Sequence, residues 1–474
     1  VSACSDDTTA GSDSTAAPSS TTTEPAPTTT MRPVPVPSLT GPIDGSPVQP
    51  QPAIPVPEGY TEEEFFVSGQ AASFVEVGGG DDPGVDVLDT ADFTTRILVR
   101  RPPADRFSGT VIVEWLNVSA VEASPDWGYL AEEVGRSGHA YVVVSAQSLG
   151  VEGGESVLSV TVDDEEAEAL GEDPDTVNET GLVNVDPERY GSLSHPGDAY
   201  AYDIFSQVGA ALSAGTAGVL GDLSAETVIA VGESQSAGFL TTHLNRVHPV
   251  GGVYDGFLVH SRGAGGAPLE GNFGDDVDDE DDSFVNDNET IRDDLDVPVL
   301  ILEAETDLTL LGYHAARQPD TELIRTWEVA GTAHSDAHVF RAFVGGPRDG
   351  SVGSLIGCER PINTGPHHEA AQAALHHLVL WSQGGPPPPA GERLGLIDGD
   401  TVEIERDELG IAIGGVRNPL VDVPVVVTTG DPWGGVARTA EDFDVCDLFG
   451  QTIELDQATL LELHGSADDY VAAF

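Results

Sequence analysis

The chain has 474 residues, of which 81 are acidic and 19 are basic, and its formal net charge is −62. Every basic residue is an arginine. With so few cations, the composition excludes nucleic acid as an expected partner and disfavours an anionic membrane surface. No apolar run approaches the ~20 residues that a membrane span requires, so we expect no transmembrane helix. We interpret the acidity as a source of solubility, in a medium whose salt screens the repulsion between like charges.

The first residues predict an exported protein. The stretch "VSAC" ends in Cys4 and has the form of the small-residue site at which bacterial lipoproteins are acylated. The sequence that follows is rich in Ser, Thr, Pro and Ala, and such a composition cannot bury enough apolar surface to fold. We therefore predict lipidation of Cys4, a disordered tether over residues 1–57, and a location at the cell surface or outside the cell. The alternative is a cysteine that stands there by chance.

Globular sequence begins near residue 58, where apolar, β-branched runs start to alternate with segments of helical periodicity. The predicted strands are 94–102, 109–117, 139–146, 226–234, 254–261, 297–307 and 322–334, and the predicted helices are 124–138, 195–215, 235–247 and 367–385. Because the strands are almost continuously apolar and alternate with helices, the pattern predicts an α/β protein with a mostly parallel sheet covered on both faces.

The predicted strands are spread over most of the sequence, which favours one domain over residues 58–474. Two acidic or glycine-rich stretches, about 147–195 and 261–294, interrupt the alternation and predict insertions beside the sheet. The remaining 390–474 mixes short strands with a terminal helix, and we expect it to pack on the domain as a C-terminal extension. No internal repeat is visible, and we expect a monomer.

The stretch "VGESQSAG" places Ser234 between a strand and a helix. A hydroxyl is a poor nucleophile without a base, but a sharp strand-to-helix turn lifts it out of the sheet, beside the free N–H groups of the helix. We predict that the N–H of Gln235 stabilises an oxyanion there. The second donor is expected from the loop after strand 109–117, at Asn117 or Val118. Ser236 stands where the usual pattern of this turn has a glycine.

A nucleophilic serine in this architecture is followed along the chain first by an acid and then by a histidine. Strand 297–307 ends in several carboxylates, and we choose Asp307 as the acid because it lies just past the strand. Glu305 is the alternative acid. The next strand is followed by His334, the predicted base, with His338 one helical turn later as its rival. The histidine would take the proton of the serine, and the acid would fix its tautomer.

The two other cysteines, Cys358 and Cys446, form an even pair if Cys4 is acylated. In an exported protein such a pair predicts a disulfide, which here would tie the C-terminal extension to the domain. The alternative is two separate buried thiols.

Motifs for metals and cofactors are not found in the sequence. "HHEAA" lacks the second histidine of a zinc-binding helix, the acidic run near 275–294 lacks the glycine and spacing of a calcium loop, and there is no glycine-rich phosphate loop or C-x-x-C pair. We expect neither a metal nor a cofactor.

These motifs resemble the α/β-hydrolase fold, and within it a bacterial family of secreted or lipid-anchored α/β-hydrolase-domain proteins. The resemblance covers about residues 58–474 and rests on "VEWLNV", "DPERYGSLSHPGDAYAYDIFSQ", "GESQSAG", "AGTAHSD", "DELGIAIGGVRNPLVDVPV" and "VCDLFG". It implies a doubly wound sheet and a serine hydrolase that acts through Ser234, Asp307 and His334. It implies no particular substrate.

The function expected from these residues is hydrolysis of carboxylic esters through an acyl-enzyme, with a small-molecule or polymeric ester as substrate. An amidase or lactonase would use the same residues, so the sequence leaves that alternative open. A non-catalytic binding protein at the cell surface is an alternative from another class. The complete set of serine, acid and histidine argues against it, because folding alone does not require all three.

Overall fold

The computed structural model describes residues 31–50, 53–78, 84–154, 156, 180–215, 218–272, 288–347, 349–397, 399, 401–431 and 444–474. Cys4 lies outside these ranges, so its lipidation stays a prediction. Within them, no helix is both long enough and apolar enough to cross a bilayer.

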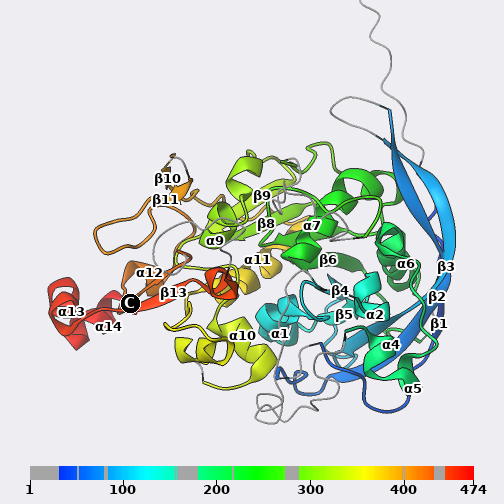
Figure 1. Cartoon of the computed structure of the whole chain (residues 1–474), viewed down its shortest axis with the longest axis horizontal. Coiled ribbons are helices and arrows are strands. Elements are labelled where there is room, and N and C mark those ends of the chain that lie inside the picture. Colours follow the sequence, from blue (N-terminus) through cyan, green and yellow to red (C-terminus); the bar gives the residue numbers. More distant parts are fainter. Residues whose placement is uncertain are drawn as a thin grey trace, which may run out of the picture.

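A nine-stranded sheet forms the centre of the molecule, in the order β1-β2-β3-β5-β4-β6-β7-β8-β9 (Figure 1). The six strands from β5 to β9 in this order are parallel, while β1, β2 and β3 continue the sheet in antiparallel fashion. This confirms the mostly parallel α/β sheet predicted from the apolar runs. The strands are β1 Ser38–Thr40, β2 Thr61–Val77, β3 Gly84–Arg101, β4 Thr110–Trp115, β5 Ala140–Val144, β6 Thr227–Glu233, β7 Gly256–His260, β8 Val299–Ala304 and β9 Ile324–Val329.

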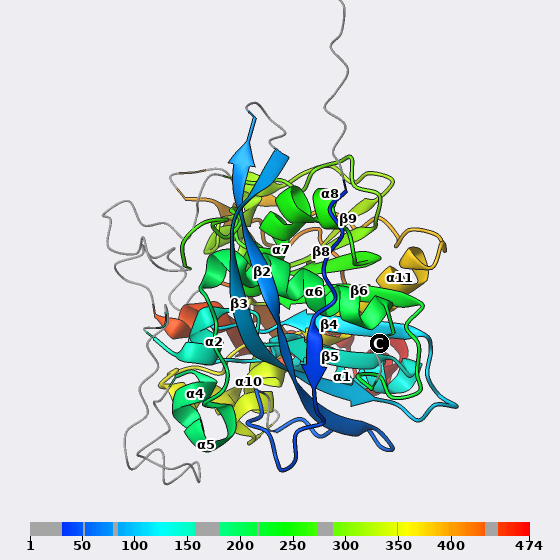
Figure 2. The same ribbon diagram turned by 90° about the vertical axis from the view of Figure 1, so that its right-hand side faces the viewer.

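Helices cover both faces of the parallel strands, because alternate strand side chains point to opposite sides. In β4, Val111, Val113 and Trp115 join the core under α6 (Ala201–Ser213) and α7 (Gln235–Thr242). Ile112 points the other way, into the core under α1 (Pro125–Ser137) and α11 (His367–Ser382). The predicted doubly wound arrangement is therefore observed. Figure 2 shows the long β2 and β3 side by side in front of the α6 layer.

Shorter elements connect and extend this frame. The predicted strand 297–307 corresponds to β8, which ends at Ala304. The residues that follow form a short helix, α9 (Glu305–Thr309). The further elements are α2 Ser148–Glu152, α4 Leu182–Val185, α5 Pro187–Tyr190, α8 His248–Gly251, α9 Glu305–Thr309, α10 Ala337–Val344, β10 Leu396–Ile397, β11 Glu403–Ile404, α12 Pro419–Asp422, β12 Val426–Thr429, β13 Gln451–Glu454, α13 Gln457–His464 and α14 Ala467–Ala473.

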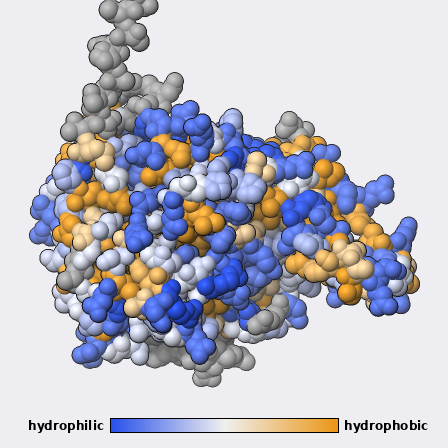
Figure 3. Space-filling view, turned by 180° about the vertical axis from the view of Figure 1, so that it is seen from behind, coloured by the Kyte–Doolittle hydropathy of each residue, from blue (hydrophilic) through white to orange (hydrophobic). Residues whose placement is uncertain are grey.

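The C-terminal helices α13 and α14 project from one end of the molecule (Figure 1). Figure 3 shows orange patches among blue ones on this projection. The exposed apolar side chains of these two helices include Leu461, Leu463, Val471 and Phe474. The rest of the extension lies against the domain: β12 pairs with β13, and Val416 bridges to Val329 at the end of β9.

The predicted tether was placed too far along the chain. The structure describes residues 31–50 and 53–57 of this segment, and β1 within it pairs with β2 in antiparallel register. Arg32 forms an ion pair with the buried Asp203 of α6. The prolines of this segment flank β1 and do not interrupt it, and an edge strand tolerates proline because one of its sides needs no ladder partner. Composition alone did not reveal this pairing.

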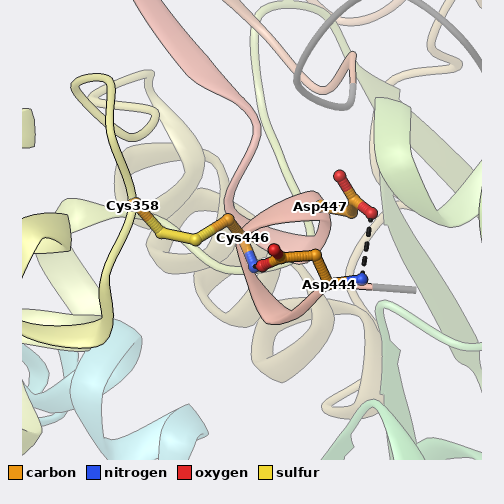
Figure 4. Close-up of a disulfide and its surroundings, with 4 residues drawn as sticks. All are labelled: Cys358, Asp444, Cys446 and Asp447. Atoms are coloured by element: carbon orange, nitrogen blue, oxygen red, sulfur yellow. Dashed lines mark hydrogen bonds between the residues drawn. A yellow bond between two sulfur atoms is a disulfide. The ribbon is translucent and has the colours of Figure 1, made fainter. Parts of the chain in front are cut away.

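Cys358 and Cys446 are joined by a disulfide, with 5.7 Å between their Cα atoms (Figure 4). Cys446 lies in a 3₁₀ turn, Val445–Phe449, whose start is capped by Asp444: its side chain accepts from the backbone N–H of Cys446 at 2.9 Å. The two cysteines belong to a small apolar cluster that includes Ile362. The bond fastens the C-terminal extension to the segment between α10 and α11, as the sequence predicted.

Candidate active site

Ser234 occupies a sharp turn between β6, which ends at Glu233, and α7, which begins at Gln235. Its backbone has φ 60° and ψ −121°, a conformation that costs an ordinary residue about 1–3 kcal/mol. The N–H of Ser234 donates to the carbonyl oxygen of His260 at 2.9 Å, which fastens the turn to β7. Gly232 lets α7 pack closely, because a Cβ there would lie 3.0 Å from the side chain of Leu240. The residues around the serine are therefore those that this turn requires.

His334 and Asp307 meet Ser234 at the carboxyl ends of the strands. The Oγ of Ser234 lies 2.8 Å from Nε2 of His334, and Nδ1 of His334 lies 2.7 Å from Oδ1 of Asp307. The other carboxylate oxygen of Asp307 accepts the backbone N–H of Ala304 at 2.6 Å, so the carboxylate is held in place. With its Nδ1–H directed at the carboxylate, His334 has a lone pair on Nε2 that can take the hydroxyl proton.

The environment of His334 favours its charged form. Burial by itself opposes the charge, but the hydrogen bond and negative charge of Asp307 outweigh it and raise the pKa of His334 above 6.5, and Glu233 adds to this shift when it is ionised. An imidazole in this position is a stronger base than one in water, and its cation is stabilised once it has accepted a proton.

Glu305, the alternative acid, makes different contacts. Its carboxylate accepts the backbone N–H groups of Gly331 and, at 3.0 Å, of Gly430, and it pairs with Arg406 at 2.7 Å. Gly430 and Arg406 belong to the C-terminal extension. Glu305 thus connects the extension to the ends of β8 and β9, and Asp307 is the acid that contacts His334.

His338, the rival base, also contacts other groups. Its Nε2 lies 3.1 Å from the carbonyl oxygen of Gly128, and its ring stacks on His368 with centroids 3.9 Å apart. The structure therefore brings His334, and not His338, to the serine.

The two predicted oxyanion donors differ in whether their backbone N–H groups already have an acceptor. Gln235 begins α7, where the first N–H groups have no acceptor within the helix. The N–H of Asn117, in contrast, donates to Ala123 at 2.9 Å, and its side chain donates to the carbonyl of Glu233 at 3.2 Å. The expectation for Asn117 was therefore wrong, since its N–H is used in a local bridge. The alternative, Val118, also has a partner: its N–H donates to the side-chain oxygen of Gln235 at 3.3 Å, a contact that must break before this N–H can bind an oxyanion.

Glu233 is a site residue that the sequence reasoning missed. Its Oε1 lies 3.7 Å from Nε2 of His334, and burial raises its pKa to about 8, with the neighbouring acids adding to the shift. A carboxyl group directly before the serine, at the end of an apolar strand, was the available signal.

A metal is not suggested by the geometry: among the described residues, no group of three or more His, Cys, Asp or Glu side chains is arranged to hold one.

Comparison with known proteins agrees with the fold. A family model for an alpha/beta hydrolase domain matches residues 24–474, so it begins inside the predicted tether. None of the curated proteins compared with the chain matches it.

Several solved structures are similar at low identity. An esterase from Rhizomucor miehei has 10% identity and a TM-score of 0.33, with 70% of this chain and 86% of that chain covered. Esterase Est22 has 12% identity and a TM-score of 0.31, with 69% and 82% covered. A bacterial heroin esterase has 10% identity and a TM-score of 0.30, with 67% and 84% covered. Since the family model spans residues 24–474, the chain belongs to the alpha/beta hydrolase domain family.

Proposed function

We propose that this protein is a serine hydrolase that cleaves carboxylic esters through an acyl-enzyme. The observation that carries the proposal is the hydrogen-bonded series Ser234–His334–Asp307, built on a strand-to-helix turn of positive φ. A half-buried serine hydroxyl aimed at a buried imidazole, which is itself held by a carboxylate, is the arrangement that makes serine a nucleophile.

The first half of the reaction acylates the serine. The Oγ of Ser234 attacks the ester carbonyl while Nε2 of His334 takes its proton, and Asp307 stabilises the resulting imidazolium. The N–H groups of Gln235 and Val118 are proposed to hold the oxyanion. The tetrahedral intermediate collapses when His334 returns the proton to the alcohol oxygen, which leaves with its alkyl group.

The second half releases the acid. A water molecule gives a proton to His334 and attacks the acyl carbon, and the proton then returns to Oγ of Ser234 as the carboxylic acid leaves. Lactones and amides would follow the same steps with a different leaving group, so the choice among them is a matter for substrate panels.

The test is covalent labelling with a fluorophosphonate, followed by hydrolysis of p-nitrophenyl esters of increasing acyl length. Ser234→Ala should abolish labelling and lower kcat on the order of 10⁴- to 10⁶-fold. Ser236→Ala is the matched control, since Ser236 is a buried serine two residues away whose hydroxyl makes no hydrogen bond within the described part of the chain. It should keep both labelling and activity. A non-catalytic protein would show neither in any form, and persistent activity in Ser234→Ala would contradict the mechanism.

Export and lipidation of Cys4 remain part of the proposal. The disulfide between Cys358 and Cys446 supports export, because disulfides persist in oxidising compartments. Metabolic labelling with an alkynyl fatty acid should mark the wild-type protein and not the Cys4→Ala variant. Equal labelling of both would contradict the anchor.

A further inference from the structure

A second series of buried polar side chains lies directly beneath the candidate active site. Oδ1 of Asp126 is 2.8 Å from Nδ1 of His260, and Nε2 of His260 is 2.8 Å from Nε2 of His367. Nδ1 of His367 is 2.9 Å from the carbonyl oxygen of Ala333. All three side chains are fully buried. They come from separate elements: the first turn of α1, the end of β7 and the start of α11.

Two members of this series, His260 in its middle and His367 at its end, meet the backbone that carries the reactive pair. The carbonyl oxygen of His260 accepts the N–H of Ser234 at 2.9 Å. At the end of the series, Nδ1 of His367 contacts the carbonyl of Ala333, the residue directly before His334. The series therefore connects the peptide beneath the nucleophile to the peptide beneath the base.

Counting hydrogens along the series assigns a role to each atom. A carbonyl oxygen can only accept, so Nδ1 of His367 carries a hydrogen. If His367 is neutral, its Nε2 is a lone pair, and the hydrogen between the two rings comes from Nε2 of His260. A neutral His260 then has a lone pair on Nδ1, so the last hydrogen comes from Asp126, which is a neutral carboxylic acid. The other complete assignment needs an imidazolium beside an ionised Asp126.

The surroundings favour the neutral assignment. Burial raises the pKa of Glu114 to about 8 as well, but Glu114 is the carboxyl group better placed to carry a charge here: it accepts the N–H of Asp126 at 2.9 Å, the hydroxyl of Tyr141 at 2.9 Å and the hydroxyl of Ser124. The second oxygen of Asp126 has no hydrogen-bond partner within the described residues. A buried carboxylate with an unsatisfied oxygen beside another carboxylate is costly, whereas a carboxylic acid there is not.

The titration behaviour of the groups agrees with this reading. Burial raises the pKa of Asp126 to about 8, and burial lowers the pKa of His260 to about 3. Burial likewise lowers the pKa of His367. The charges of Asp307 and His334, in the candidate active site, act on both imidazoles. Glu114 acts electrostatically on Asp126. The ring of Tyr129 packs against both imidazoles.

We propose that Asp126, His260 and His367 form a neutral positioning relay, in which a protonated Asp126 donates through two imidazoles and so fixes the backbone beneath Ser234 and His334. The inference rests on the proposed serine-hydrolase function for its kinetic consequence, but the protonation states stand independently of it. Each nitrogen of the two imidazoles is either a donor or an acceptor, so neither ring can flip without losing its hydrogen bonds. The relay thereby maintains the distance between Ser234 and His334. These are positioning residues, since they reach the reaction through Ser234 and His334.

The kinetic test compares two substitutions at Asp126. Asp126→Asn keeps a donor, because its amide can donate to Nδ1 of His260, and we expect kcat within about threefold of wild type. Asp126→Leu removes the donor at similar volume and should lower kcat about ten- to hundredfold with little change in KM, because the reacting atoms are displaced. His338→Gln, outside the relay, is the control and should keep wild-type kcat. Equal losses in both Asp126 variants, or no loss in Asp126→Leu, would overturn the relay.

The spectroscopic test does not depend on activity, and its variants serve only to assign the resonances of the wild-type protein. In wild-type protein labelled with ¹⁵N-histidine, the relay predicts a neutral Nε2–H tautomer for His260 and a neutral Nδ1–H tautomer for His367 between pH 5 and 7. Resonances are assigned from the His260→Gln and His367→Gln spectra. An imidazolium at either residue would overturn the proposal. A wild-type protein that hydrolyses no ester and takes no label would contradict the proposed function, and these tautomers would still decide the relay.

Discussion

Glu305 and Asp307 stand two residues apart in α9, but their carboxylates serve different parts of the molecule. Asp307 bonds to Nδ1 of His334 at 2.7 Å, whereas Glu305 bonds to backbone N–H groups and to Arg406 of the C-terminal extension. A turn of helix at the end of β8 thus directs one acid to the candidate active site and the other to the join between the domain and its extension.

This difference predicts opposite consequences for two similar substitutions. Asp307→Asn should lower kcat by roughly 10²–10⁴, because the amide no longer stabilises the imidazolium. Glu305→Gln should change kcat far less, but should lower the free energy of unfolding by about 1–3 kcal/mol, because Arg406 loses a buried charged partner. Ester kinetics and denaturant unfolding of both variants measure this. The reverse ranking of kcat would make Glu305 the acid.

The pKa of His334 sets the acid side of the pH profile. A general base must be neutral, and the pKa of His334 is raised above 6.5 although burial opposes its charge. Activity should therefore fall as the pH drops through a midpoint above 6.5. Asp307→Asn removes the main group that raises this pKa, so its residual activity should fall at a lower pH. We expect this order from kcat/KM measured between pH 5 and 8, and an unchanged midpoint in the variant would be inconsistent with it.

Glu233 should act on the alkaline side. Burial raises its pKa to about 8, so it is neutral at pH 7 and ionises above about pH 8. Ionisation places a negative charge 3.7 Å from Nε2 of His334, where it stabilises the imidazolium that forms as Ser234 loses its proton. The kcat/KM of the wild type should rise through pH 8, and that of Glu233→Gln should stay level. Identical profiles from pH 7 to 9.5 would show that Glu233 does not couple to the base.

Ser234 is held in a backbone conformation that glycine adopts more readily. Its φ of 60° should make Ser234→Gly more stable than Ser234→Ala, by about 1 kcal/mol after the greater flexibility of glycine in the unfolded chain is counted. Both variants lack the hydroxyl and should be inactive, so Ser234→Ala is the matched control. Calorimetric melting temperatures give the comparison, and a less stable glycine variant would argue that the turn is not strained.

The disulfide should contribute substantially to stability. It joins cysteines separated by 88 residues, and chain-entropy estimates for a loop of that size give about 4–5 kcal/mol. The double variant Cys358→Ser/Cys446→Ser should unfold at a lower denaturant concentration than the wild type. A reductant should bring the wild type to the same value and leave the variant unchanged. If the reductant shifts neither protein, the bond does not form in solution.

The sequence by itself predicted the class of fold, and it named the residues of the candidate site. Alternating apolar runs and helical periodicity are local properties, so they identified the strands from β4 to β9 and the helices α1, α6, α7 and α11 before any contact was known. The order of Ser234, an acid and His334 followed from the same pattern, because the ends of parallel strands meet at one edge of the sheet.

The tertiary structure decided what depends on the direction of single side chains and on contacts between distant segments. Ser234 and His334 are 100 residues apart, and which of two carboxylates meets the histidine depends on a turn of α9 that replaced the predicted end of a strand. The edge pairing of β1 was hidden by its proline-rich composition. The series from Asp126 to His367 joins residues that no sequence motif relates, since a hydrogen bond between buried side chains requires only proximity in space.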